Sequence, residues 1–175
     1  MGLVQHHSPV LLLMAAFSQH EAALDWACEK ATAVWGPLAM RSDRFSFDET
    51  DYYQPTMGAD LKKTFFVFER PIDPTELPQI KHQTNGWEDT YAQLGHSSQE
   101  RPLNLDPGYL TEAKLVLATT KDRDHRVYLS QGIYAEVTLH YQRGQWHSRP
   151  WTYADYQRED YHQFFTQCRD YMRRR

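Results

Sequence analysis

Hydrophobic and polar positions in the first part of the chain occur in blocks that predict a strand followed by a helix. Residues 10–17 form an unbroken apolar run, and its length predicts a strand that is buried on both faces. Ser18 precedes Glu21 by three residues, which predicts a capping box at the start of a helix. We expect this helix to end at Trp35, because Gly36-Pro37 follows it.

Two more strands and a long helix are predicted next. Residues 38–47 and residues 61–69 have the composition of strands. The string Asp73-Pro74-Thr75-Glu76 supplies an N-cap, a proline in the first turn and an acid, so a helix should begin there and end at Gly95. Its apolar face follows from positions spaced by three and four residues, namely Leu77, Ile80, Thr84, Trp87, Tyr91 and Leu94.

The pattern of the remaining segments completes the predicted fold. Asp106-Pro107-Gly108 fits a type II turn, and residues 114–121 fit either a strand or a short helix, of which we favour the strand. Thr152 and Asp155 repeat the capping pattern before a last helix. The apolar stripe of that helix is Tyr161, Phe164, Phe165, Cys168 and Tyr171. The order β-α-β-β-α-β predicts one α+β domain over residues 1–175, with a ferredoxin-like core, an antiparallel hairpin extension and a C-terminal helix.

The hairpin extension carries the most specific pattern. Residues 133–141 alternate between apolar and polar side chains, which predicts a strand with one apolar and one polar face. Partners across a hairpin share a face, so a two-residue loop at Gln131-Gly132 is excluded and the three-residue loop Ser130-Gln131-Gly132 is expected. In that register Leu129 opposes Ile133, Tyr128 opposes Tyr134, Val127 opposes Ala135, and Arg126 opposes Glu136. A following loop at Arg143-Gly144 sets Tyr141 against Trp146 and His140 against His147.

Composition narrows the classes of function. The chain has 175 residues, a net charge of -4, eleven Tyr and five Trp, which favours a packed globule over a disordered chain. A mildly acidic total charge argues against a protein that holds long nucleic acids by bulk charge. Cys28 and Cys168 lack the spacing of a disulfide framework or a metal site, and the run of residues 10–17 is too short to span a bilayer and has no basic segment before it. We therefore expect a cytoplasmic protein with no membrane contact.

Candidate chemistry centres on the polar face of the hairpin. Arg126 and Glu136 fit an exposed cross-strand ion pair, or a guanidinium held by its carboxylate neighbour so that it grips a phosphate or carboxylate. Lys121 and His125 would supply further donors to such an anion. The chain contains no phosphate-binding glycine loop, dinucleotide fingerprint, zinc-protease motif or nucleophile elbow.

Metal binding is a further hypothesis. Asp48, Asp51, Asp106 and Glu136 could together hold Mg²⁺, which prefers carboxylate oxygen and often bridges to phosphate. Asp48 and Asp51 also fit a capping or turn role before Tyr52-Tyr53, and Asp106 fits the start of its turn. His140 and His147 resemble two metal ligands, although a solvated pair is the commoner arrangement. Lys81, Asn85 and Glu88 form a polar stripe on the long helix that solvent contact would explain.

The chain resembles a bacterial and archaeal family, the domain of unknown function family 4416, through the string Asn104-Leu105-Asp106-Pro107-Gly108-Tyr109. The resemblance extends over almost the whole chain, including residues 47–53, 118–121, 125–129, 132–139 and 151–153. The family is functionally uncharacterised. The resemblance implies a shared site at the polar residues of these strings: Asp48, Asp51, Asp106, Lys121, His125, Arg126 and Glu136.

Two hypotheses about function follow. The first is a site for a phosphate-bearing or nucleotide-like small molecule, catalytic or not: Lys114, Lys121, His125 and Arg126 contact the anion, Asp48, Asp51, Asp106 and Glu136 hold metal or exchange protons, and Tyr53 or Tyr134 stacks on the ligand. The alternative is a non-enzymatic module whose open sheet face, with Tyr128 beside Tyr134, binds single-stranded RNA or a protein partner. A homodimer could also form through the exposed edge of the hairpin.

Overall fold

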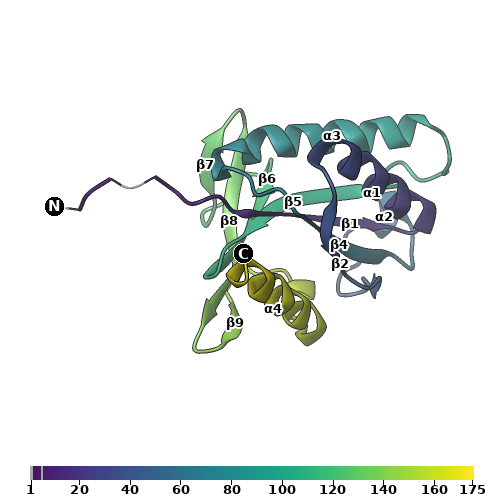
Figure 1. The fold of residues 1–175 in the computed structure, drawn as a ribbon. Coiled ribbons are helices and arrows are strands. Elements are labelled where there is room, and N and C mark those ends of the chain that lie inside the picture. Colours follow the sequence, from purple (N-terminus) through teal and green to yellow (C-terminus); the bar gives the residue numbers. More distant parts are fainter. Residues whose placement is uncertain (1, 5) are drawn as a thin grey trace.

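One antiparallel sheet with helices on both of its faces organises the computed structural model, which describes residues 2–4 and 6–175 (Figure 1). Nine strands belong to this sheet in the described residues: β1 (Leu11–Ser18), β2 (Leu38–Arg41), β3 (Phe45–Ser46), β4 (Lys62–Phe68), β5 (Asn104–Leu110), β6 (Lys114–Thr119), β7 (Val127–Ser130), β8 (Ile133–Gln142) and β9 (Gln145–Ser148). The α-helices are α1 (Glu21–Trp35), α2 (Gln54–Met57), α3 (Leu77–Gln93) and α4 (Glu159–Arg173), and the short 3-10 helices are η1 (Pro74–Glu76) and η2 (Asp155–Gln157).

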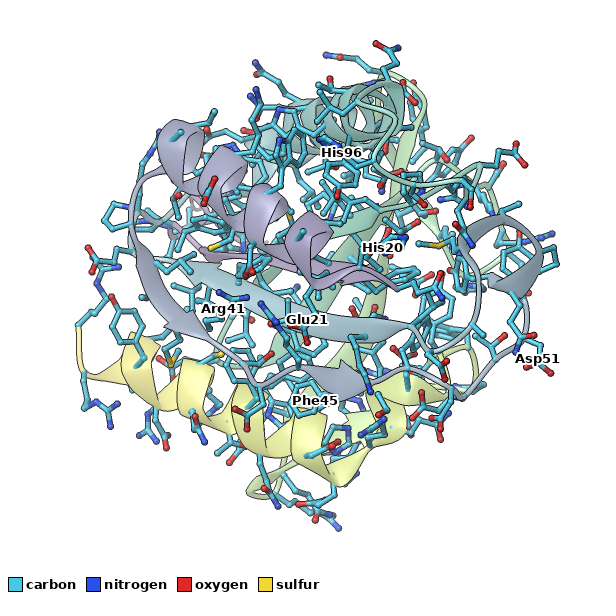
Figure 2. The ribbon with its side chains drawn as sticks, turned by 90° about the vertical axis from the view of Figure 1, so that its right-hand side faces the viewer. His20, Glu21, Arg41, Phe45, Asp51 and His96 are labelled. Atoms are coloured by element: carbon cyan, nitrogen blue, oxygen red, sulfur yellow. The ribbon has the colours of Figure 1, made fainter. Side chains whose placement is uncertain are left out.

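The strands lie in the order β2-β4-β1-β5-β6-β8-β7, with β3 also paired to β4 and β9 to β8. Helices α1 and α3 cover one face, and α4 covers the other face, as Figures 1 and 2 show from two directions. The chain is therefore an α+β protein with a large antiparallel sheet and a C-terminal helix, as the pattern predicted at this level.

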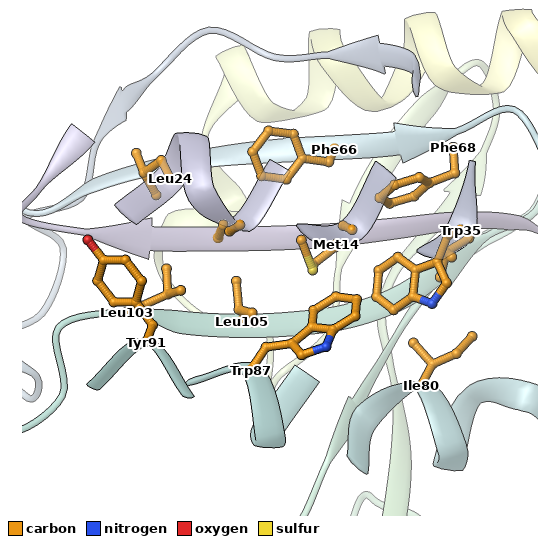
Figure 3. Close-up of a cluster of buried hydrophobic side chains, with 14 of the residues drawn as sticks. Met14, Leu24, Trp35, Phe66, Phe68, Ile80, Trp87, Tyr91, Leu103 and Leu105 are labelled. Atoms are coloured by element: carbon orange, nitrogen blue, oxygen red, sulfur yellow. The ribbon is translucent and has the colours of Figure 1, made fainter. Parts of the chain in front are cut away.

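The central strand β1 shows why the first apolar run is unbroken. Leu12, Met14 and Ala16 pack with α1 and α3 in the cluster drawn in Figure 3, while the intervening side chains pack toward α4. All eight residues of β1 are buried. The prediction of a strand buried on both faces is confirmed, because neighbouring side chains of a strand point to opposite faces.

The long helix α3 is confirmed, with one difference at its end. Asp73 and Glu76 form the capping box that opens η1, and α3 continues from it. The apolar face is buried as far as Tyr91, whereas Leu94 is exposed. Gly95 ends the helical segment with a φ of 69°, a backbone conformation that glycine adopts without strain.

Two predicted capping boxes are wrong. The Ser18 hydroxyl donates to the Pro102 carbonyl at 2.6 Å and accepts from the His20 N–H at 2.9 Å, so it ties the β1–α1 turn to the segment before β5 instead of capping the helix. The Thr152 hydroxyl donates to the Thr138 carbonyl at 2.6 Å, and the Asp155 carboxylate pairs with a lysine in the site described below. In both places a long-range partner replaces the expected local one.

The predicted strand over residues 38–47 is interrupted. It forms β2 and β3, both paired to β4, with a bulge between Leu38 and Met40. Between the two strands Ser42 bonds Phe65 through its backbone N–H and also accepts the Phe65 N–H with its side-chain oxygen at 2.8 Å. The Ser42 side chain therefore replaces a backbone carbonyl as the acceptor for the Phe65 N–H. This substitution ends the regular strand pairing at Ser42.

The predicted type II turn at residues 106–108 is wrong, because these residues are part of strand β5. Pro107 lies opposite Met14 of β1, and pairing with β6 begins only at Gly108. The N–H and C=O of Leu105 point away from β1 and bond to side chains of α3. Pro107 has the same orientation two residues later, so its missing N–H faces a side of β5 that no strand covers there.

The hairpin register is confirmed at two pairs and wrong at its loop. Val127 opposes Ala135 and Tyr128 opposes Tyr134, but Ser130, not Leu129, pairs with Ile133. The loop is the two-residue turn Gln131-Gly132, with φ values of 53° and 76°, and Leu129 is accommodated in a bulge. Leu129 is an extra residue on β7 without a partner on β8. It allows Tyr128 to stay opposite Tyr134 although the loop has only two residues. The second loop, at Arg143-Gly144, has the predicted pairs Tyr141 with Trp146 and His140 with His147.

A second bulge divides the face of β8 that was predicted to be uniformly apolar. The pairing with β6 shifts at Thr138, because Leu115 opposes Leu139 whereas Val116 opposes Val137. Ile133 and Val137 consequently pack with Leu77 of α3, while Leu139 packs toward α4. The side chain of Glu136 lies on the α4 face of the sheet, opposite Leu117 in the register. The expectation of one continuous apolar face is corrected accordingly.

Candidate functional site

A cleft of about 900 Å³ lies where β5 and β6 separate. This volume falls within the range of small-molecule sites. Its wall combines side chains from α3, β4, β5 and β8 with the loops before α2, after β6 and before η2. Among the described residues, six cations and six carboxylates line it: Lys63, Lys81, Arg101, Lys121, Arg123 and Arg126, and Glu49, Glu88, Asp89, Asp106, Glu136 and Asp155.

The gap between the two strands is held by α3. Lys81 donates to the Leu105 carbonyl at 2.9 Å and to Oδ1 of Asp106 at 3.2 Å, and Glu88 accepts the Leu105 N–H at 2.6 Å. Asn104 donates to the other oxygen of Asp106 at 2.9 Å. The unpaired edge of β5 is satisfied by side chains instead of a strand, which leaves room for a cleft beside it.

A buried ion pair forms another part of the wall. Lys63 of β4 donates to Asp155 at 2.5 Å, and both side chains are at most 5% exposed. The Lys63 ammonium also lies 4.2 Å from the ring centre of Phe47 and 4.9 Å from that of Tyr156, within the distance of cation–π contacts. These contacts explain how a charged side chain is accommodated inside strand β4.

Arg126 and Glu136 form a second buried pair. Arg126 donates through Nε to Glu136 at 2.8 Å, and its other nitrogens donate to the Lys121 carbonyl at 3.0 Å and to the Tyr153 hydroxyl at 2.8 Å. The Arg126 and Glu136 side chains are 6% and 2% exposed, so the interpretation as an exposed surface pair is wrong. His125 Nε2 lies 3.3 Å from the same carboxylate.

Three tyrosines share the cleft wall with Asp106 and Asp155. Burial raises the pKa of Tyr53, Tyr153 and Tyr156, that of Tyr153 to about 12, and the negative charge of Asp106 raises each of them further. The three hydroxyls therefore keep their protons at neutral pH and can donate hydrogen bonds as well as accept them. The Tyr156 hydroxyl is buried and has no hydrogen-bond partner among residues 2–4 and 6–175.

The rim of the cleft differs from its interior. Lys121 and Arg123 are exposed, and in the part of the chain that the structure describes no carboxylate lies within 4.0 Å of either cationic group. Lys121 Nζ donates to the Tyr52 hydroxyl at 3.2 Å and lies 5.2 Å from the centre of that ring. Interior cations are paired with carboxylates, whereas two cations at the rim are not.

The structure brings five of the ten predicted site residues into the wall of the cleft: Tyr53, Asp106, Lys121, Arg126 and Glu136. Asp48 and Asp51 are exposed on the loop before α2, where Asp51 accepts from the Gln54 side chain and lies at the periphery of the molecule in Figure 2. His125 contacts Glu136 from outside the wall.

The other two predicted residues lie elsewhere. Lys114 is at the opposite end of β6, paired with His140, and Tyr134 packs edge-on against Tyr128 at a centroid distance of 5.3 Å. Within residues 2–4 and 6–175, no group of three His, Cys, Asp or Glu side chains has the arrangement of a metal site. The four carboxylates proposed for Mg²⁺ do not come together, because Asp48 and Asp51 stay on their loop. His140 and His147 lie 5.2 Å apart between ring centres without a third such ligand in the described chain.

Several residues of the cleft were missed or misinterpreted. Lys81 is buried, so solvent contact does not explain the polar stripe on α3, and its partners lie 24 and 25 residues away. Asp155 was interpreted as part of a capping box, and Lys63 was not singled out, although a lysine that precedes the apolar run of β4 is a signal that could have been used. Tyr153 and Tyr156 carry no local signal, since their positions depend on η2 packing beside the sheet.

Glu88 makes the stability of the protein depend on pH. Burial raises the pKa of Glu88 from 4.5 to about 7, against the lowering effect of the nearby Lys81 charge. Between these values the folded state binds the proton more strongly than the unfolded chain does, so the free energy of unfolding falls as pH rises through this window. Relative to Glu88→Gln, we expect the wild type to lose roughly 1 to 3 kcal/mol between pH 4.5 and 7.5. Urea unfolding of both proteins across this range measures the difference, and parallel stability curves would contradict the expectation.

Comparison with known proteins identifies the family. The model of a family described as a domain of unknown function (DUF4416) matches residues 8–171, and the chain belongs to this family. No curated protein and no solved structure matches the chain. Among the described residues, no helix combines the length and the apolar character needed to cross a membrane.

Proposed function

We propose that this DUF4416 protein binds a phosphate-bearing, nucleotide-like small molecule in the cleft. The observation that carries the proposal is the distribution of charge: Lys121 and Arg123, at the rim of a cavity of about 900 Å³, have no carboxylate partner within the described part of the chain. A phosphate is the group that two adjacent, solvent-accessible cations hold well. The size of the cavity suits a ligand larger than inorganic phosphate.

The contacts at the rim support a ligand whose phosphate lies against Lys121 and Arg123. Lys121 and Arg123 follow β6, and the backbone carbonyl of Lys121 is bonded by Arg126, which is itself buried against Glu136. The loop that carries the rim cations is thus attached to a rigid ion pair. Tyr52 lies beside Lys121 and offers a ring at the entrance on which a flat part of a ligand can stack. Arg126 serves to position the loop, because all three of its nitrogens already have partners.

The strand order supports a finer description of the fold. Apart from the two-residue strand β3, the first four strands in the sequence, β1, β2, β4 and β5, lie in the order β2-β4-β1-β5, and the helices that follow β1 and β4 cover the same face. We propose on this basis that these elements are a ferredoxin-like core, to which the β6–β9 segment and α4 are added.

Binding is tested by isothermal titration calorimetry with adenosine diphosphate and with pyrophosphate, each with and without Mg²⁺. We expect the double variant Lys121→Ala, Arg123→Ala to bind at least about tenfold more weakly than the wild type, since two charge-assisted contacts are lost. Lys114→Ala is the matched control, because it removes a cation at the far end of β6 and should leave the affinity unchanged. The wild-type affinity should also fall as salt is added.

The alternative function uses the hairpin instead of the cleft. Tyr128 is exposed beside Tyr134, and the outer strand β7 also exposes Val127. These features support binding of RNA or of a protein partner, including a second copy of the chain. If neither phosphate compound binds the wild type, while a mixed oligonucleotide or self-association is detected and is lost in Tyr128→Ala, the cleft proposal is abandoned for this one.

A further inference from the structure

We infer that the floor of the cleft recognises an uncharged, hydroxyl-rich part of the ligand, of the kind that a ribose or another sugar ring provides. The floor is the part of the wall formed by Tyr53, Tyr153 and Tyr156 and by the ion pairs Lys63–Asp155, Lys81–Asp106 and Arg126–Glu136. This inference rests on the proposed function and specifies the class of ligand: a sugar phosphate or ribonucleotide whose phosphate lies at the rim.

The first argument is the balance of charge at the floor. Lys63 is bonded to Asp155, Lys81 to Asp106, and Arg126 to Glu136. A charged ligand group placed among these pairs would have to break one of them and leave its partner unpaired in a buried setting, which is costly. A neutral group that both donates and accepts hydrogen bonds does not disturb the pairs. The floor therefore suits a neutral polar group better than an anion.

The second argument is an unused hydrogen-bonding group. The Tyr156 side chain is 2% exposed, lines the cleft, and its hydroxyl has no partner among the described residues. A buried hydroxyl without a partner costs free energy, and native proteins seldom leave one without a role. The buried Oε2 atom of Glu49, also in a residue of the cleft wall, is likewise unpaired, while its Oε1 atom accepts from Arg158 at 2.7 Å.

The third argument is the mixture of groups that share the cleft wall with Tyr156. Asp106 and the hydroxyl of Tyr53 can accept hydrogen bonds, and Tyr153, whose oxygen already accepts from Arg126, still has its own proton to donate. Each hydroxyl of a sugar both donates and accepts, so a polyol matches such a wall of alternating partners. The carbon-bound hydrogens of a sugar ring can at the same time pack on the faces of the aromatic rings.

Two pairs of matched ligands test the inference by calorimetry. Ribose 5-phosphate is compared with pentyl phosphate, which has five carbons and no hydroxyl group, and adenosine monophosphate is compared with its 2′,3′-dideoxy analogue. We expect the hydroxylated member of at least one pair to bind about tenfold more tightly. We expect Tyr156→Phe to reduce this preference at least about fivefold.

Tyr161→Phe is the control variant. The Tyr161 hydroxyl is also buried and has no partner in the described part of the structure, but Tyr161 does not line the cleft, so its removal should leave the preference unchanged. Both variants should be as stable as the wild type without ligand or slightly more so, because each loses a hydroxyl that has no partner.

The outcomes separate the two proposals. Equal binding of both members in each pair, or a preference that Tyr156→Phe leaves intact, overturns the inference about the floor and leaves phosphate binding at the rim in place. Absence of binding by every phosphate compound, pyrophosphate included, overturns the proposed function and the inference with it.

Discussion

Replacing Gly108 by alanine is expected to destabilise the fold by about 3 kcal/mol or more, because no space exists for a side chain there. A Cβ atom at this position would lie 2.2 Å from the backbone carbonyl oxygen of Val116 and 2.8 Å from a methyl carbon of Leu117. The first of these atoms belongs to the backbone of β6 and cannot rotate away. Gly108 is also the residue at which pairing between β5 and β6 begins, so the variant should separate the two strands from that point.

Gly86→Ala is the matched control for this prediction. Gly86 lies inside α3, is exposed, and has no atom within 4 Å of an added Cβ. Alanine should therefore stabilise the helix by up to about 1 kcal/mol. Urea unfolding followed by tryptophan fluorescence measures both variants. A Gly108→Ala protein within 1 kcal/mol of the wild type would show that β6 can shift away from β5, contrary to the expected close contact.

Removing the carboxylate of Asp155 is expected to cost about 3 to 5 kcal/mol of stability. Asp155→Ala would leave the Lys63 ammonium buried between β4 and η2, with aromatic rings around it and without the carboxylate that now lies at 2.5 Å. The aromatic contacts compensate only a part of this, since cation–π contacts contribute roughly 1 to 2 kcal/mol. The midpoint of urea unfolding should fall accordingly.

Two further proteins show whether the effect comes from burial. Glu112→Ala breaks contacts of 3.6 and 3.8 Å with Arg173 and Arg169 at a side chain that is 60% exposed, and should change stability by less than about 0.5 kcal/mol. The double variant Lys63→Met, Asp155→Leu removes both charges and should recover much of the stability that Asp155→Ala loses. If Asp155→Ala is no less stable than Glu112→Ala, the buried pair is not the structural element proposed here.

Local patterns predicted those elements whose stabilising contacts are near in sequence or follow from periodicity. The apolar run of β1, the capping box before α3 and the loop at Arg143-Gly144 are of this kind. The predictions that are wrong concern residues whose partners are distant. Ser18 and Thr152 have the composition of helix caps, but Pro102 and Thr138 offered them buried carbonyl groups.

Bulges account for the errors in the hairpin. Strict alternation in β8 predicted one apolar face, and the bulge at Thr138 turns the residues after it to the other face. The bulge at Leu129 allows the two-residue loop, which had been excluded because partners across a hairpin must share a face. A bulge leaves no reliable mark on the alternation of residue types, because it is set by the fit of one strand against its neighbour. Glu136 precedes the bulge at Thr138, so its face follows from the alternation, whereas the bulge brings Leu139 to the same face as Glu136.

The amino-acid sequence by itself determined the long helices, the central strand that is buried on both faces, and the loop at Arg143-Gly144. Only the tertiary structure decided that there is a cleft and which side chains line it. Lys63 and Asp155 are 92 residues apart, and Lys81 reaches Asp106 only because residues 104–107 of β5 are not paired with β6. Periodicity is a local property of the chain, whereas the position of a charge relative to its partner depends on strand order and on the places where pairing stops.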